Sequence, residues 1–337
     1  PLQALAAKLL AAENGSDSAR YLNRVSVLDA DLVVDDKPSG TLWHAPRIDL
    51  ILKRRPGGVV ADLDADLEIG GQSSRLSADA EYLAANQRLQ VRLGLNGFEP
   101  AWLARHNAAW TALAAVDLPL SGDLTFSLGL GGRLSDLDFD LSARSGSVEL
   151  PGTFKRRLEL AGATLRGSLT DSFSVLRLDE ISLDTGGPVV NASALVSLGE
   201  GTDLNTFGLT IEGGIGDLPV DQLERFWPPQ LAPAARDWVT TNVRGGTVPT
   251  ANVKIILKPG DLAAGSLPAE AVDLRFSFEG VSTRYLKSMP ELAQAKGSAR
   301  LTAAGIDLAL QSGRVGELAL NEGTLHIEGF GEPQQRA

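Results

Sequence analysis

The stretch Val59–Ile69, which reads VVADLDADLEI, decides the fold. Its odd-numbered residues are all apolar, and Asp62, Asp64, Asp66 and Glu68 lie between them. Successive side chains of a β-strand point to opposite faces of the sheet, whereas a helix would spread these acids around its circumference. The stretch therefore predicts a strand with one apolar face and one acidic face.

The same alternation recurs along most of the chain. It runs through residues 21–98, 118–216 and 247–330, for example in Leu89–Leu95 and Val272–Phe278, and Gly, Asn, Asp or Pro residues separate the runs. About eighteen strands are expected by these criteria. The prediction is a mainly β chain built from a long antiparallel sheet, in which each strand has one wet and one dry face.

Short helical patterns interrupt these runs. Leucines recur at helical spacing in Pro1–Glu13, and residues 218–246 hold a pair of helical patterns separated by Pro228-Pro229. No Ser/Gly-rich or highly charged tract marks a flexible linker. We therefore expect an N-terminal helix at 1–16, a β segment at 17–217 with a helical insertion near 99–116, a helical insertion at 218–246, and a β continuation at 247–337.

Composition excludes several classes of protein. The 337 residues include 42 Asp and Glu against 31 Lys and Arg, a net charge of −11, which argues against nucleic acid and against charge-driven binding to anionic membranes. The absence of cysteine excludes disulfides, thiolate zinc sites and a cysteine nucleophile. Hydrophobic residues at 43% supply ample material for a core, and no apolar run reaches the ~18 residues of a spanning helix.

Candidate catalytic and metal-binding residues are sparse. His44, His106 and His326 lie far apart, without His, Asp or Glu partners at ligand spacing. A calcium site requires a turning loop, whereas the two acidic triplets of the chain alternate along predicted strands. These triplets are Asp62, Asp64 and Asp66, and Asp136, Asp138 and Asp140. We interpret them as solvated strand faces, and we expect no enzymatic activity, no cofactor and no metal.

The apolar strand faces require a covering layer, and the helical patterns are too few to provide it. Two arrangements stay open: a sandwich that closes on itself, or a curled sheet whose apolar face holds acyl chains. In the second arrangement, the parity of the strands predicts the lining residues. They are Leu63, Leu67, Leu93, Phe126, Leu128, Phe139, Leu274, Phe276 and Leu308.

One motif resembles a known family. Trp227–Val239 reads WPPQLAPAARDWV and is followed by Asn242 and by Gly245–Val248, which reads GGTV. This succession of WP, LxPxARxW and GxV is similar to that of AsmA-like proteins, specifically the YhdP-type branch. The hairpin at Val25–Asp35 and the stretch Gly280–Leu286 extend the resemblance over most of the chain.

The resemblance implies a long, taco-like β-groove in the bacterial cell envelope, with a few short helical insertions. Such a protein is anchored in the inner membrane, lies in the periplasm and carries phospholipid toward the outer membrane, whose integrity depends on that supply. We interpret this chain as an internal segment, so the anchors would lie outside it. The alternative is a non-transporting structural or binding β-sandwich module of the envelope.

The resemblance brings no catalytic residues to this sequence, so its motif is expected to be structural. The motif residues are Trp227, Pro228, Pro233, Arg236, Trp238 and Gly246. We expect the two tryptophans to pack the helical insertion onto the sheet.

Overall fold

A computed structural model describes residues 23–36, 41–69, 72–85, 87–106, 108–129, 134–149, 157–170, 174–198, 206–227, 229, 233–261, 268–284 and 289–328. Most of these residues lie in β-strands, and 18 strands belong to one antiparallel sheet. The predicted mainly β fold with few short helices is confirmed. The chain divides into two compact units. Unit 1 holds the described residues within Pro1–Gly146 and Thr164–Phe173, and unit 2 those within Ser147–Ala163 and Ser174–Ala337.

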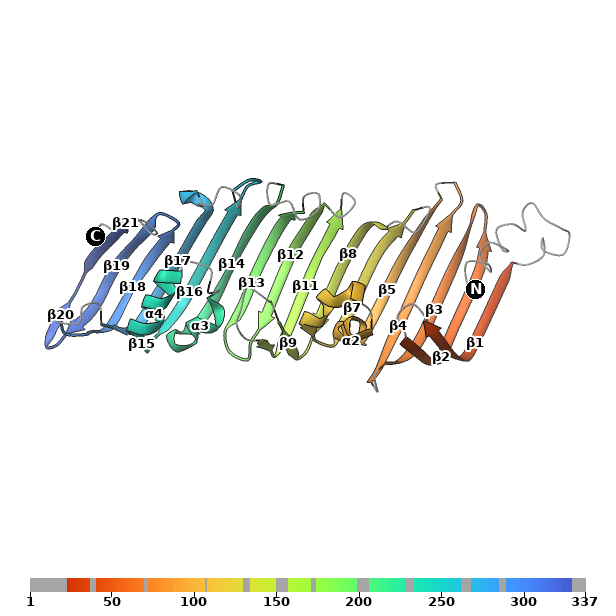
Figure 1. Ribbon diagram of the computed structural model, residues 1–337, viewed down its shortest axis with the longest axis horizontal. Coiled ribbons are helices and arrows are strands. Elements are labelled where there is room, and N and C mark those ends of the chain that lie inside the picture. Colours follow the sequence, from red (N-terminus) through yellow and green to blue (C-terminus); the bar gives the residue numbers. More distant parts are fainter. Residues whose placement is uncertain are drawn as a thin grey trace. The chain divides into compact units, whose positions relative to one another are not determined.

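Unit 1 is an antiparallel succession of long strands (Figure 1). Its elements are β1 (Arg24–Asp36), β2 (Thr41–Arg55), β3 (Gly58–Ile69), β4 (Gln72–Leu83), β5 (Arg88–Phe98), α2 (Pro100–His106), a 3₁₀ helix (Ala108–Ala115), β6 (Val116–Asp117), β7 (Leu120–Leu128), β8 (Leu134–Ala143) and most of β11 (Gly162–Thr170). Apart from the short β6, each strand pairs with the next one in this order. The period-two alternation of the sequence produces this architecture, because every strand can then place its apolar side chains on the same face.

Unit 2 repeats this organisation. Its strands are β9 (Gly146–Val148), β10 (Leu158–Leu160), β12 (Val175–Asp184), β13 (Val189–Ser197), β14 (Gly208–Pro219), β15 (Val243–Arg244), β16 (Thr247–Leu257), β17 (Val272–Thr283), β18 (Leu292–Thr302), β19 (Gly305–Val315), β20 (Leu318–Leu320) and β21 (Gly323–Glu328). Its helices are α3 (Leu223–Phe226), α4 (Pro233–Asn242) and 3₁₀ helices at Val220–Gln222 and Ala269–Ala271. The long strands pair in chain order, and both β20 and β21 pair with β19.

A row of irregular positions crosses four neighbouring strands of unit 2. Asp217 in β14, Gly280 in β17 and Gln294 in β18 have φ of 50°, 70° and 51°. Between these strands, β16 shifts its register against β17 between Thr247 and Ala251. A positive φ is uncommon for residues other than glycine, and an extra residue in a strand bends it locally. The sheet of unit 2 therefore bends along this row.

Each irregular position also shifts the apolar alternation by one residue, so that the apolar face stays continuous. In β14 the apolar residues are Ile211 and Ile215 before Asp217 and Leu218 after it, and Val220 follows at the start of the 3₁₀ helix. Leu218 and Val220 are buried in the same cluster that Ile215 packs against. In unit 1, β1, β2 and β5 have equivalent shifts.

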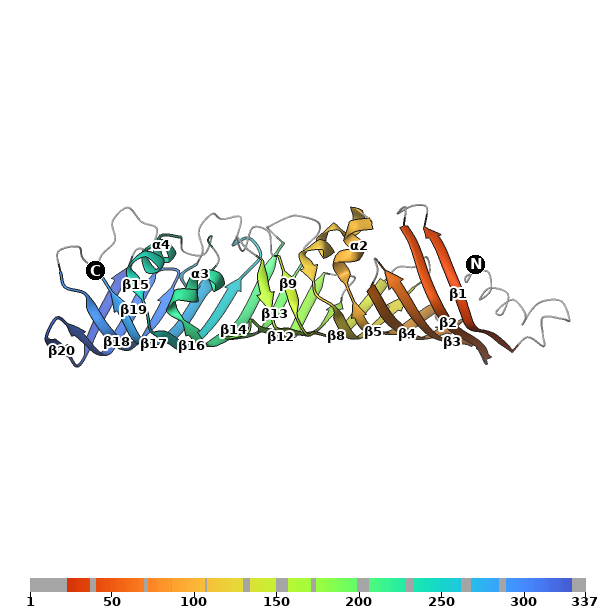
Figure 2. The ribbon, with the colours of Figure 1, turned by 90° about the horizontal axis from the view of Figure 1, so that it is seen from below.

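Helices stand on the apolar side of the strands in each unit (Figure 2). In unit 1, Trp102 of α2 is buried, and its ring meets Trp43 of β2 edge-on with the ring centroids 4.8 Å apart. In unit 2, Leu223 and Phe226 of α3 pack against a cluster of buried residues from the sheet. Helices of the structure lie within both of the insertions predicted near 99–116 and at 218–246. The predicted N-terminal helix at 1–16 lies outside the described residues.

Two buried clusters of unit 2 lie at opposite ends of its strands. The cluster next to α3, here called the α3 cluster, consists of Leu218, Val220, Val248, Phe278, Val281 and Ala295. The second cluster consists of Ala271, Val272 and Leu301. On β17, for example, Val272 and Val281 are buried, whereas Leu274 and Phe276 between them are only half-buried. The middle of the apolar face is therefore the least covered part.

Candidate functional site

Antiparallel pairing aligns the apolar residues of unit 1 in rows that cross the strands. One row consists of Val27, Leu50, Leu63, Ala78, Leu93, Leu124 and Phe139. A second row, two residues along each strand, consists of Val25, Leu52, Ala61, Ala80, Val91, Phe126 and Leu137. Neither row contains a polar side chain. Together they form an apolar surface that crosses seven strands without interruption, here called the apolar face of unit 1.

The residues that parity predicts for unit 1 lie on this face. The six residues predicted in unit 1 are all half-buried: Leu63, Leu67, Leu93, Phe126, Leu128 and Phe139. Leu128 pairs with Leu89 one step beyond the second row, whereas Leu67 lies nearer the other strand ends and pairs with Ser74. Leu67 is thus at the margin of the apolar face.

Unit 2 has two comparable rows. The first consists of Ile215, Ala251, Phe276, Ala299, Leu308 and Leu325, and the second of Gly213, Val253, Leu274, Leu301, Ile306 and Ile327. The three residues predicted here, Leu274, Phe276 and Leu308, lie in these rows and are half-buried. The two rows together are called the apolar face of unit 2.

These faces have the chemistry of a site for a long apolar ligand. Their side chains can make dispersion contacts and release water, but they offer no hydrogen bonds that would select a particular ligand. Each row contains one or two positions with alanine or glycine, which leaves depth between the larger neighbours. Contiguous exposed apolar surface on a water-soluble fold is typical of binding or interaction sites.

The opposite face of unit 1 is acidic. Asp62 lies directly across from Asp79, and the ammonium group of Lys53 is 3.1 Å from the Asp62 carboxylate. Neighbouring like charges are destabilising unless solvent or counter-charges screen them, and the acids on this face are exposed or half-exposed. Within the described residues, no group of three or more His, Asp or Glu side chains is placed to hold a metal ion.

Two histidines on the polar side are each held by two carboxylates. On β2, the Nδ1 of His44 is 3.0 Å from Glu68 Oε2 on β3, and its Nε2 is 3.2 Å from Asp31 Oδ1 on β1. The hydrogen bond to Glu68 and the attraction of Asp31 raise the pKa of His44. Protonated His44 therefore links three neighbouring strands across the sheet.

His326 on β21 has the same surroundings. Its Nε2 is 2.8 Å from Oε1 of Glu328, and its Nδ1 contacts Asp307 on β19. Hydrogen bonds to Glu328 and Asp307 raise the pKa of His326. The sequence analysis found no partners for these histidines, because most of the carboxylates lie on other strands. Strand pairing brings Asp31 and Glu68 to His44, and Asp307 to His326.

We expect the pKa of His44 and His326 to lie above the ordinary value of about 6.5. Since folding raises both values, the stabilisation is complete below the unfolded pKa and is lost as pH rises through the folded pKa. NMR titration of the imidazole C–H signals measures both values, and His44→Gln and His326→Gln assign them. Titration of both residues at or below the ordinary value would contradict the two-carboxylate geometry.

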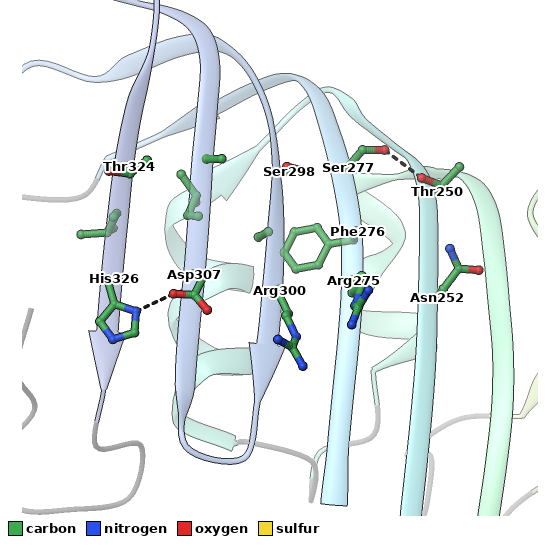
Figure 3. Close-up of a pocket in the computed structure, with 14 residues that line it drawn as sticks. Thr250, Asn252, Arg275, Phe276, Ser277, Ser298, Arg300, Asp307, Thr324 and His326 are labelled. Atoms are coloured by element: carbon green, nitrogen blue, oxygen red, sulfur yellow. Dashed lines mark hydrogen bonds and ion pairs between the residues drawn. The ribbon is translucent and has the colours of Figure 1, made fainter. Parts of the chain in front are cut away.

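A shallow cleft of about 550 Å³ lies on the polar side of unit 2 (Figure 3). Arg275 and Arg300 are cross-strand neighbours within it, and both guanidinium groups donate to the carboxylate of Asp273. These hydrogen bonds hold the pKa of Asp273 at about 2. His326, which also lines the cleft, is paired with Glu328 and Asp307 as described above. The cations of the cleft are thus neutralised by neighbouring acids, which disfavours an anion site here.

In the motif of the α3–α4 insertion, the structure changes the roles that were expected. Trp238 is 46% exposed on α4, so the prediction that it packs the insertion onto the sheet is wrong. Arg236 is the buried residue, with 6% exposure. Its Nε donates to the Trp227 carbonyl at 3.0 Å, and its Nη2 donates to the carbonyl and the carboxylate of Glu224 at 3.4 and 3.2 Å.

The other motif residues have different structural places. Trp227 is half-buried and ends α3, and Pro233 begins α4, whereas Pro228 lies outside the described residues. Gly246 has φ of 72°, and a Cβ atom there would clash with the carbonyl oxygen of Glu279. Glycine is therefore required where the insertion returns to the sheet.

Comparison with family models, with curated proteins and with solved structures finds no match. Among the described helices, none has the length and apolar character needed to cross a membrane.

Proposed function

We propose that the chain is a segment of a lipid-transfer protein whose apolar faces carry the acyl chains of phospholipids. The observation that carries this proposal is the set of apolar rows in each unit. They cross consecutive strands, contain no charged side chain, and consist mostly of half-buried residues. A hydrocarbon chain that lies along such a row completes the covering layer that the fold itself does not supply.

The mechanism would be passive. Each methylene group that leaves water contributes about 0.8 kcal/mol, wherever it lies on the face. Because successive positions along a row are chemically alike, a chain can move from one to the next without losing much of this stabilisation. Phospholipid headgroups would stay in water beyond the edges of the apolar face. No catalytic residue, cofactor or energy-coupling site is needed within the segment.

The cellular setting in this proposal rests on the AsmA-like motif around Trp227–Val248. By that resemblance, the segment belongs to a bridge-like protein of the YhdP type, which lies in the periplasm and is anchored in the inner membrane outside this chain. Its partners would be phospholipids and the two membranes of the envelope.

A non-transporting β-sandwich is the alternative function class. A sandwich requires a second sheet packed about 10 Å above the apolar face, and the half-exposed rows favour a lipid ligand over such a sealed core. Native mass spectrometry of the purified chain separates the two, because the lipid-transfer proposal expects co-purified phospholipid. Protein that is free of lipid from every preparation would favour the structural alternative.

A parity experiment tests the site directly. A photo-crosslinking amino acid at Phe126 or Phe276 is expected to capture phospholipid in cells, because both side chains lie on apolar faces. The same group at Asp64 or Asp138 is expected to capture none, because those positions lie on the acidic face. Lipidomic analysis of the crosslinked protein gives the readout. Equal capture from both faces would contradict the proposal.

A further inference from the structure

The apolar face of unit 2 is bounded on both sides. Along the strands, side chains on one face recur about every 6.7 Å, and the rings of Phe276 and Phe278 on β17 are 6.5 Å apart. Phe276 belongs to the half-exposed first row, whereas Phe278 is 9% exposed in the α3 cluster. At the other boundary, Ala271 and Val272 are 1% and 5% exposed. Between the boundaries lie the two rows, in which Leu274, Phe276, Ile306 and Leu308 are half-buried and Ala299 and Leu301 are buried.

Leu223 and Phe226 of α3 form one of these boundaries. Both pack against the α3 cluster, together with Phe276, Leu308 and Leu310 from the sheet. Phe278 of this cluster lies in one row with Leu310, next to the first row of the apolar face and nearer the strand ends. In effect, two apolar side chains of the protein lie where a further hydrocarbon chain would fit.

Several contacts fix this boundary in place. The base of the insertion is closed by a hydrogen bond from the Val220 N–H to the Gly246 carbonyl, and β15 pairs with the end of β17. The guanidinium group of Arg225 donates to the Glu159 carbonyl of β10 at 2.8 Å. The buried Arg236 joins α4 to the end of α3. α3 is thus held at the base of the insertion, at β10 and through α4.

We infer that Leu223 and Phe226 are a side wall that limits the apolar face of unit 2 to two rows, the width of the two tails of one diacyl lipid. Two rows span about 13 Å, which gives each extended chain one row. This inference rests on the proposed lipid-transfer function. It adds that the apolar face of unit 2 holds one two-tailed lipid across its width, so that lipids lie in single file. It also names Leu223 and Phe226 as the residues that set this width.

The test uses two neighbouring phenylalanines of β17 as a matched pair. In the otherwise unchanged chain, a photo-crosslinker at Phe276 is expected to capture phospholipid, whereas the same group at Phe278 is expected to give only background. In the double variant Leu223→Ala/Phe226→Ala, capture at Phe278 is expected to rise to the level at Phe276. Trp238→Ala, an exposed change in the same insertion, is expected to leave both signals unchanged.

The outcomes separate a failure of the side-wall inference from a failure of the lipid-transfer proposal. Equal capture at Phe276 and Phe278 in the otherwise unchanged chain would overturn the side-wall inference. A folded double variant with no increase in lipid capture at Phe278 would overturn it as well. The comparison in the unchanged chain needs no substitution in α3, so it decides the question even if the double variant does not fold. Capture at neither position, nor at Phe126, would instead overturn the lipid-transfer proposal.

Discussion

Substitution of Arg236 by methionine is expected to destabilise unit 2 by about 3 kcal/mol, because it removes the hydrogen bonds that the buried guanidinium group donates at the end of α3. The Arg236 side chain is 7% exposed and donates to the carbonyls of Glu224 and Trp227. These carbonyls belong to the last turn of α3, where no intrahelical donor is available. Methionine keeps the apolar stem of the side chain but removes the cation that caps the helix.

Thermal melting measures this effect, with an expected decrease of roughly 6–12 °C for a unit of this size. Trp238→Ala is the matched control from the same helix. Since Trp238 is 46% exposed, its truncation is expected to change the stability by only about 0.5 kcal/mol or less. If Trp238→Ala destabilised the chain more than Arg236→Met, the insertion would be held by its tryptophan after all.

Phe126→Asp is expected to abolish lipid loading of unit 1. Phe126 lies within a row of apolar residues, and an unpaired carboxylate among acyl chains costs several kcal/mol. Because Phe126 is only half-buried, water can solvate the new carboxylate and the fold is expected to persist. The measurement is the phospholipid that co-purifies with the variant, together with its melting temperature.

Thr125→Asp is the control, since it adds the same charge to the same strand on the opposite, exposed face. It is expected to leave lipid content unchanged. Unfolding by Phe126→Asp but not by Thr125→Asp would indicate a sealed core instead of an open lipid-binding face. Equal loss of lipid in both variants would indicate that the negative charge acts without regard to the face.

The sequence alone was sufficient to predict the strands and the face of the sheet to which each side chain points. Leu63, Leu93 and Phe139 were assigned to one face by parity, and strand pairing places them in a single row. The physical reason is that the side-chain period of a strand is a local property of the backbone. The two internal helical insertions were predictable for the same reason, since proline, glycine and apolar spacing act locally.

The shifts in the alternation were visible in the sequence but were not interpreted. The apolar residues of β14 change from odd to even positions at Asp217, where the backbone adopts a positive φ. Such a change of phase is the signal of a bulge, and it could have located the bend of the sheet. The division into two units near residue 146 had no such signal, because the strands on both sides carry the same alternation.

By itself, the sequence determined the mainly β fold, the two faces of its strands and the positions of its internal helices, because each of these depends on neighbours close in the chain. Only the tertiary structure decided which residues lie together across strands. It buried Arg236 and exposed Trp238, which sequence spacing could not distinguish on a ten-residue helix. It also placed His44 and His326 between carboxylates, most of them on other strands, and it left the middle of the apolar faces half-exposed. These features depend on packing between segments distant in sequence, which no local pattern records.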